Sequence, residues 1–308
     1  MNRHLLTAAL FLATTLPVYA QHEGLTPTET LISLDAKAPE ALTPQNINLK
    51  VNNRETTLNS LTPVRPNGVQ IALLIDDGLR ESVGRNINDL KKFITSLPPG
   101  TEIFVGYMQN GRVIPAQEFT TDYVAAANSL RLPIGSPGLS ASPYFCLSDF
   151  AKKWPAPAEG NSGHKARFVM MITNGVDPYN GSTNITNQNS PYVDAAVADA
   201  QRAGIAVYSI YYSDAGFRGQ QASFSGQSYL SEVAEGTGGR AYFEGSGNPV
   251  SMAPFLDEFR KAIAETYVAT FDAPGNKELV PLKVSTNLHS AKLRAPEQVH
   301  PGNQIAGQ

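Results

Sequence analysis

Residues 69–80 read VQIALLIDDGLR, and this stretch decides the fold class. Its first seven positions are apolar except for Gln70, as expected of a strand that is buried on both faces of a parallel sheet. Two carboxylates, Asp76 and Asp77, follow directly, and Gly78 begins a turn. In a doubly wound sheet the ligand site lies beyond the carboxyl ends of the strands, so this acidic pair stands where such a site is expected.

The next residues alternate between helical and strand patterns. Apolar residues recur at steps of four and three from residue 83 to residue 97, which draws one stripe along a helix. A second strand is predicted at 102–109. Asn110-Gly111 is a strong hairpin signal and turns the chain into an antiparallel strand at 112–120.

The alternation continues through the C-terminal half of the chain. Ser-Pro pairs at 142–143 and 190–191 predict two helix starts, because serine is a good cap and proline is favoured at the first helical position. Further buried strands are predicted at 166–173 and 205–213. The sequence therefore predicts a doubly wound, mostly parallel α/β sheet with one antiparallel hairpin strand, within a domain that spans residues 67–266.

Short β segments flank this domain on both sides. An alternating stretch with a turn at Asn52-Asn53 predicts a hairpin, and strand patterns return after the last helix. We expect residues 46–66 and 267–298 to form a small β appendage. Residues 21–45 are polar and without a clear period, so we interpret them as a flexible leader, and residues 299–308 as a tail.

Residues 1–20 have the pattern of an export signal. The apolar run from Leu5 to Leu16 is too short to span a bilayer as a helix, and Val18-Tyr19-Ala20 offers the small residues that a signal peptidase needs. The alternative is an N-terminal membrane anchor, which the lack of stop-transfer residues disfavours. We therefore predict a periplasmic or secreted protein that begins near Gln21 and has no membrane insertion in its mature form.

The net charge and the cysteine content argue against a nucleic-acid binder and against a disulfide-bonded protein. The whole chain carries a formal charge of −3, and removal of the signal, which contains Arg3 and no acidic residue, makes the mature chain one charge more negative. Such a chain lacks the basic footprint of a nucleic-acid binder. Cys146 is the one cysteine, so no intrachain disulfide forms, and its apolar neighbours favour a core position.

The order of strands, the early hairpin strand and two loop positions resemble the von Willebrand factor A (VWA) domain family over about residues 69–266. In that family the first strand ends in Asp-x-Ser-x-Ser, a threonine comes from a later loop, and the fourth strand ends in Thr/Ser-Asp-Gly. Together these residues hold a Mg²⁺ whose open position takes a carboxylate from the partner. The resemblance implies a VWA-like fold that binds a protein partner at the carboxyl edge of the sheet.

This sequence keeps the frame of that metal site and loses most of its ligands. The matching positions are Asp76, Gly78, Arg80, Ser140 (or Ser142 in its place) and Asn174. Only the first is a carboxylate, since glycine and arginine occupy the two serine positions and an amide replaces the second carboxylate. The resemblance therefore implies a degenerate metal-ion-dependent adhesion site.

Two interpretations of the acidic pair remain open. The first is that Asp76 and Asp77 cap the next helix and pair with Arg80, whose guanidinium substitutes for the missing ion. The second is a weak Mg²⁺ site made of Asp76, Asp77 and water. We expect the first, and thus no strongly bound metal and no other cofactor.

Aromatic residues among small polar ones mark two further loops. One follows the fourth strand, and the other is predicted at 214–227, ahead of a helix that is predicted to start at Ser228. This composition is typical of recognition surfaces. The alternative is a solvated loop whose aromatic side chains pack against their own domain. The candidate partner-binding residues are Asp77, Tyr179, Phe217, Arg218 and Phe224.

The sequence predicts a non-catalytic, exported protein that binds a protein partner. Paired histidines, a nucleophile elbow and a phosphate-binding loop are all missing from the sequence. Two alternatives stay open. One is a metal-assisted exported hydrolase that uses the cleft at Asp76 and Asp77, and the other is a structural unit of a surface complex.

Overall fold

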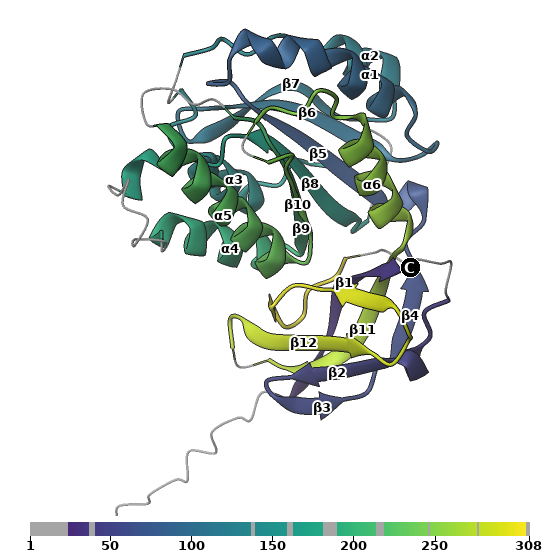
Figure 1. Ribbon diagram of the computed structural model, residues 1–308. Coiled ribbons are helices and arrows are strands. Elements are labelled where there is room, and N and C mark those ends of the chain that lie inside the picture. The colour runs from purple at the N-terminus through teal and green to yellow at the C-terminus, as the bar shows by residue number, and fades with distance from the viewer. Residues whose placement is uncertain are drawn as a thin grey trace, which may run out of the picture.

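A computed structural model gives the fold of most of the chain. It describes residues 24–36, 41–136, 139–158, 163–180, 190–213, 219–245, 247–275 and 277–305, with the backbone alone for residues 219–224. The predicted signal at 1–20 lies outside this range. The described residues form an α/β part and a β-sandwich that lies beside it (Figure 1).

The α/β part is built on a six-stranded sheet. In spatial order its strands are β10 (Ala241–Tyr242), β9 (Ile205–Tyr211), β8 (Ala166–Thr173), β5 (Val69–Asp76), β6 (Glu102–Gln109) and β7 (Arg112–Thr120). Neighbouring strands run parallel, except that β7 is antiparallel to β6. All eight residues of β5 are buried, because the strand has neighbours on both sides and helices on both faces. The predicted fold class is confirmed.

Helices cover both faces of this sheet. They are α1 (Ile87–Thr95), α2 (Tyr123–Asn128), α3 (Pro143–Lys152), α4 (Pro191–Arg202), α5 (Gly219–Thr237) and α6 (Ala253–Ala264). Residues of α1, α2 and α6 join one buried apolar cluster, and residues of α3, α4 and α5 join another on the opposite face. None of the helices in the described ranges has both the length and the apolar character needed to cross a bilayer.

Ser142 and Ser190 start α3 and α4 as predicted. Each side-chain oxygen accepts a hydrogen bond of 3.3 Å from the backbone N–H two residues later, and proline follows each serine. The helix predicted to begin at Ser228 begins instead at Gly219, so much of the predicted loop 214–227 is helical. The residues before Ser228 carry no apolar stripe, but a helix that has already formed is extended at little cost, because each added residue also adds a backbone hydrogen bond.

The second part is a sandwich of two four-stranded antiparallel sheets. One sheet has the order β13-β1-β11-β4, and the other has the order β14-β12-β2-β3. The strands are β1 (Leu25–Ala36), β2 (Ile47–Val51), β3 (Arg54–Thr56), β4 (Ser60–Pro63), β11 (Thr266–Pro274), β12 (Val280–Thr286), β13 (Ala291–Arg294) and β14 (Gln298–Val299). Side chains such as Leu49 and Phe271 fill the space between the sheets.

The prediction of a flexible leader at residues 21–45 was wrong for the residues that the structure describes. Within that range, β1 pairs with β11 over nine residue pairs and with β13 over four more. Ile32 and Leu34 are buried in the sandwich. The alternating threonines of this stretch look polar, although a β-branched side chain favours a strand. The predicted small appendage is therefore a full sandwich, with the α/β part inserted between β4 and β11.

A substitution in β1 distinguishes a buried strand from a flexible leader. Ile32→Ala removes a side chain that is 0% exposed, so the free energy of unfolding should fall by about 2–5 kcal/mol. Leu25→Ala, at a position that is 69% exposed, should change it by about 0.5 kcal/mol or less. Urea titration of both variants measures the difference, and equal stability of the two would show that β1 lies outside the core.

Candidate functional site

The carboxyl ends of β5 and β8 are joined through the buried side chain of Asp76. Its Oδ2 accepts a hydrogen bond from the Thr173 hydroxyl at 2.7 Å, and its Oδ1 accepts one from the Gly78 N–H at 2.9 Å. Neither the short 3₁₀ helix at Glu81–Asn86 nor α1 has a side-chain cap at its start. The prediction that the acidic pair caps the next helix was therefore wrong, since Asp76 ties two strand ends together.

Asp77 pairs with Arg131, a residue that the sequence analysis did not single out. The guanidinium makes two hydrogen bonds to the carboxylate, at 2.6 and 2.7 Å, and lies 3.8 Å from the centre of the Tyr107 ring. Asp77 also accepts hydrogen bonds from the Gln109 side chain and, at 3.0 Å, from the Ile134 N–H. We call Asp77, Tyr107, Gln109 and Arg131 the Asp77 cluster.

These contacts keep Asp77 ionised. Burial raises its pKa, but the hydrogen bonds from Arg131, Gln109 and Ile134 outweigh burial and hold the pKa below its ordinary value. The hydrogen bond to Asp77 in turn raises the pKa of Arg131. The sequence predicts Arg80 as the cationic partner of the acidic pair, and for Asp77 the structure shows Arg131 in this role, 54 residues away along the chain.

The other positions of the predicted metal site leave little room for ligands. A Cβ atom at Gly78 would lie 3.0 Å from the carbonyl oxygen of Ser136, so a serine fits there only if the backbone moves. The side-chain oxygen of Asn174 accepts a hydrogen bond of 2.9 Å from the Val176 N–H. Ser140 is buried in the loop before α3.

These residues do not fit the Mg²⁺ that the VWA resemblance implies. Mg²⁺ requires a near-octahedral shell of oxygens, with one or two carboxylates that are free to bind. Both oxygens of Asp76 already accept hydrogen bonds, and the charge of Asp77 is matched by that of Arg131. Within the described part of the chain, no three His, Cys, Asp or Glu side chains come together as a possible metal site.

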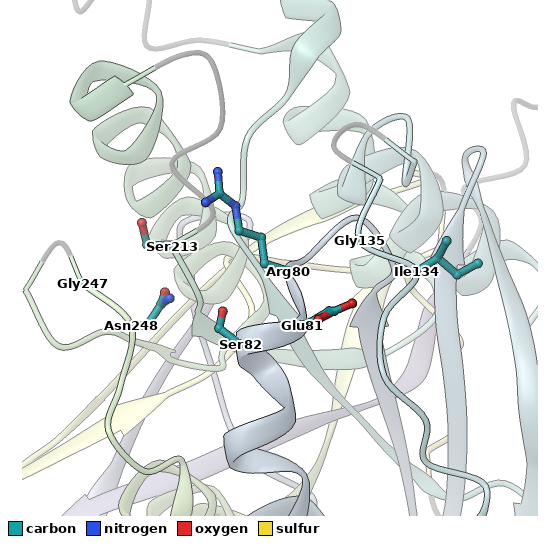
Figure 2. A pocket seen from close by; sticks show the side chains of 8 residues that line it. All are labelled: Arg80, Glu81, Ser82, Ile134, Gly135, Ser213, Gly247 and Asn248. Atoms are coloured by element: carbon teal, nitrogen blue, oxygen red, sulfur yellow. The ribbon is translucent and has the colours of Figure 1, made fainter.

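A cavity of about 790 Å³ opens at this edge of the sheet. Its lining comes from the loops after β5, β9 and β10 and from the loop before α3, and consists of Arg80, Glu81, Ser82, Ile134, Gly135, Ser213, Gly247 and Asn248. Figure 2 shows the Arg80 side chain between Ser213 on one side and Gly135 on the other. The Gly135 N–H donates to the backbone carbonyl of Asp77 at 3.1 Å, so the Asp77 cluster supports one wall of this cavity.

The predicted partner-binding residues have different outcomes. Tyr179 is exposed, and its ring centre lies 5.2 Å from that of Phe145 on α3. Phe217 and Arg218 lie outside the described residues. Phe224 belongs to α5, but its side chain is also outside the described part.

Sequence reasoning missed two members of this edge for different reasons. Gln109 ends β6, the strand next to β5, and a polar residue at the carboxyl end of a buried strand could have indicated a site residue. Arg131 follows α2 in a segment without any recognisable spacing, and only the tertiary structure brings it to Asp77.

The sheet order and the antiparallel strand at its edge define a doubly wound, mostly parallel α/β fold. Among solved structures, proximal thread matrix protein 1 from the mussel byssus is similar, with a TM-score of 0.42, 15% identity and coverage of 67% of this chain. The match spans 48% of the mussel chain, or about half of it. The VWA domain of SpRpn10 is similar with a TM-score of 0.37 and 10% identity, over 62% of this chain and 94% of that domain. Neither a family model nor a curated protein matches the sequence.

The Asp77 cluster predicts a particular dependence of stability on pH. Because the folded pKa of Asp77 is depressed, the stability that its carboxylate contributes is fully present above the ordinary aspartate pKa of 3.8 and is lost as the pH falls through the folded pKa. Arg131→Met should lower the free energy of unfolding at pH 7 by about 2 kcal/mol, a moderate value because Arg131 is 41% exposed. The difference from wild type should shrink as the pH is lowered from about 5 to about 3.

Urea titrations across this pH range provide the measurement. Lys153→Met is the control, since it breaks a surface ion pair with Asp149 and should cost only about 0.5 kcal/mol at pH 7. An Arg131→Met effect that stays constant down to pH 3 would contradict the role assigned to the Asp77 carboxylate.

Metal affinity is the second expectation from this site. Titration calorimetry with Mg²⁺, Mn²⁺ and Ca²⁺ should detect no ion that binds tighter than about 1 mM, a strength typical of weak extracellular sites. A micromolar dissociation constant that Asp76→Ala abolishes would overturn this interpretation of the carboxyl edge.

Proposed function

We propose that this protein is an exported, non-catalytic binding protein that recognises a protein partner through the carboxyl edge of its six-stranded sheet, without a strongly bound metal. Export rests on the sequence of residues 1–20 alone. The recognition face consists of the described residues of the loops after β5, β8, β9 and β10 and of the loop before α3, together with the first turn of α4. The following observation carries the proposal.

Exposed apolar side chains gather at this edge. Of the nine large apolar residues that are exposed in the described part of the chain, six lie here: Leu132, Ile134, Tyr179, Tyr192, Phe243 and Val250. One of them, Ile134, lines the 790 Å³ cavity together with polar residues such as Arg80 and Glu81. Apolar anchors within a polar rim are the usual composition of a surface that binds a protein.

The Asp77 cluster holds part of this face in place before a partner binds. The backbone carbonyl of Leu132 accepts a hydrogen bond of 2.9 Å from the Arg131 guanidinium, and the Ile134 N–H donates to Asp77. The two exposed apolar side chains therefore stand on a loop that is fixed to β5. A preorganised loop loses less conformational entropy on binding, which favours affinity.

The alternative of a metal-assisted hydrolase receives less support from the same edge. Hydrolysis by a bound metal needs several convergent ligands and a general base, whereas Asp76 and Asp77 are both occupied by hydrogen bonds. Burial raises the pKa of the Cys146 thiol, which disfavours a cysteine nucleophile nearby. The proposal of a non-catalytic role rests on this arrangement.

Loss of one exposed anchor should weaken partner binding and leave the fold intact. Ile134→Ala and Tyr179→Ala should each reduce affinity by at least about tenfold, since truncating an engaged anchor at an interface often costs this much. The melting temperature should hardly change, because both side chains are exposed. The measurement is capture of the partner from the native envelope by immobilised mature protein, followed by a titration of the identified partner.

Val124→Ala is the matched control for Ile134→Ala. The two side chains are 65% and 62% exposed, but Val124 lies in the first turn of α2, at the opposite edge of the sheet. Phe217→Ala, Arg218→Ala and Phe224→Ala extend the test to the segment 214–227. If the variants at the carboxyl edge and the control bind the partner equally, recognition takes place elsewhere. A partner that never dissociates would favour the structural-unit alternative.

A further inference from the structure

Three aromatic rings meet on the recognition face, where α3 and α4 lie side by side (Figure 1). Phe145 lies in the first turn of α3, Tyr179 in the short 3₁₀ helix Pro178–Asn180 after β8, and Tyr192 in the first turn of α4. The ring centre of Phe145 is 5.2 Å from that of Tyr179 and 4.6 Å from that of Tyr192. We call these three residues the aromatic cluster. It shares no residue with the lining of the 790 Å³ cavity.

The rings of the aromatic cluster are open to solvent and stand at an angle to one another. Tyr179 is 56% exposed, Tyr192 is 36% exposed and Phe145 is half-buried. The plane of the Phe145 ring makes an angle of 34° with that of Tyr179 and of 84° with that of Tyr192. The cluster therefore offers ring faces in more than one direction. Because the face of an aromatic ring is negative, these faces attract cations and not anions.

A buried carboxylate is hydrogen-bonded to the backbone of the cluster. Asp177 is 6% exposed, and it accepts a hydrogen bond of 3.1 Å from the Tyr179 N–H and one of 2.7 Å from the Ser190 hydroxyl. In the parts of the chain that the structure describes, Asp177 forms no ion pair. Residues 181–189, GSTNITNQN, contain neither lysine nor arginine. A cation placed on the cluster would therefore compensate a charge that has no counter-charge there.

Further acidic groups make the surroundings of the cluster negative. Burial raises the pKa of the Tyr144 hydroxyl, which neighbours the cluster on α3, and the charges of Asp177 and Glu232 raise it further. Glu232 on α5 is hydrogen-bonded to Asp194 on α4. Arg112 follows the hairpin turn that packs beside the cluster and opposes these carboxylates with a single positive charge. The potential at the cluster thus favours a positively charged ligand.

We propose that the aromatic cluster binds an arginine side chain of the protein partner. This inference rests on the proposed function, because it names what the partner presents to the recognition face. The planar guanidinium stacks on an exposed tyrosine ring and is attracted by Asp177. Arginine is favoured over lysine, since a guanidinium is planar and less strongly hydrated than an ammonium group. The formal charge of −3 on the whole chain also favours a basic partner at longer range.

Titration of the mature protein with short peptides, followed by NMR, tests the site without the partner. The probe is acetyl-Gly-Arg-Gly-amide, which should bind with a dissociation constant below about 10 mM. Acetyl-Gly-citrulline-Gly-amide replaces the guanidinium by a neutral urea of the same shape and should bind at least about tenfold more weakly. Acetyl-Gly-Lys-Gly-amide keeps the charge without the planar group and should bind at least about threefold more weakly.

Tyr179→Leu and Tyr192→Leu keep an apolar side chain but remove the ring. Each should weaken binding of the arginine peptide at least about threefold, because a ring face is lost, and the melting temperature should hardly change. Phe243→Leu is the matched control. Phe243 is 44% exposed and follows β10 at the same edge of the sheet, but it does not belong to the aromatic cluster, so this variant should bind the peptide as wild type does.

A second pair of variants tests the charge of Asp177. Asp177→Asn removes the charge at nearly unchanged size and should weaken binding of the arginine peptide at least about threefold. Ser190→Ala loses the hydrogen bond to Asp177 but keeps its charge, so it should bind nearly as wild type does. Melting temperatures of both variants show whether they are folded.

Three results would overturn the assignment. The first is no binding of the arginine peptide at about 10 mM, and the second is equal binding of the citrulline peptide, which would define an uncharged aromatic surface. The third is equal binding by the Tyr179→Leu, Tyr192→Leu and Phe243→Leu variants, which would place the peptide elsewhere. Partner capture is measured independently of these peptides. Capture without peptide binding would therefore remove only this inference, and peptide binding without a captured partner would remove only the proposed function.

Discussion

The antiparallel pairing of β1 with β11 is the contact on which the rest of the structure depends. It joins residues 25–33 to residues 266–274 and closes a loop of roughly 230 residues that contains the whole α/β part. Helix α6 ends at Ala264 and β11 begins at Thr266, so the connection has no flexible linker. The Thr266 hydroxyl donates to the carbonyl of Ala262 at 2.7 Å and fixes this junction further. The inserted part is thereby held at one orientation against the sandwich.

Fixed placement of side chains from distant segments matters in two parts of the fold. At the junction, side chains from both parts enclose a small cavity whose shape depends on their fixed placement. At the carboxyl edge, Arg131 supplies a positive charge beside Asp77 in a region where the VWA resemblance implies a metal ion. A guanidinium that belongs to the chain is present at any ion concentration, so the loop that carries Ile134 is held without a cofactor. Its planar donors also fix the geometry of the carboxylate more closely than a hydrated ion would.

The features that could be predicted from the sequence are local ones. The buried run of β5, the Asn110-Gly111 turn and the serine caps of α3 and α4 each involve residues that are close together in the chain. The features that were missed depend on distant contacts. Arg131 meets Asp77 across 54 residues, and the polar pattern of β1 becomes a strand only beside β11. The cavity at the junction takes its lining from residues between Ser33 and Arg294, so no spacing in the sequence indicates it.

The position of β1 at the start of the sandwich also sets an order of events during synthesis. Its two neighbours within the sheet, β11 and β13, come from the last fifth of the chain and emerge from the ribosome last. The strands of the α/β part have partners nearer in sequence, and contacts of low sequence separation form faster. During elongation β1 therefore carries unpaired backbone groups and apolar side chains such as Ile32, which is the state of a strand edge most open to aggregation. A nascent chain of this topology needs its first strand shielded until the C-terminal strands arrive.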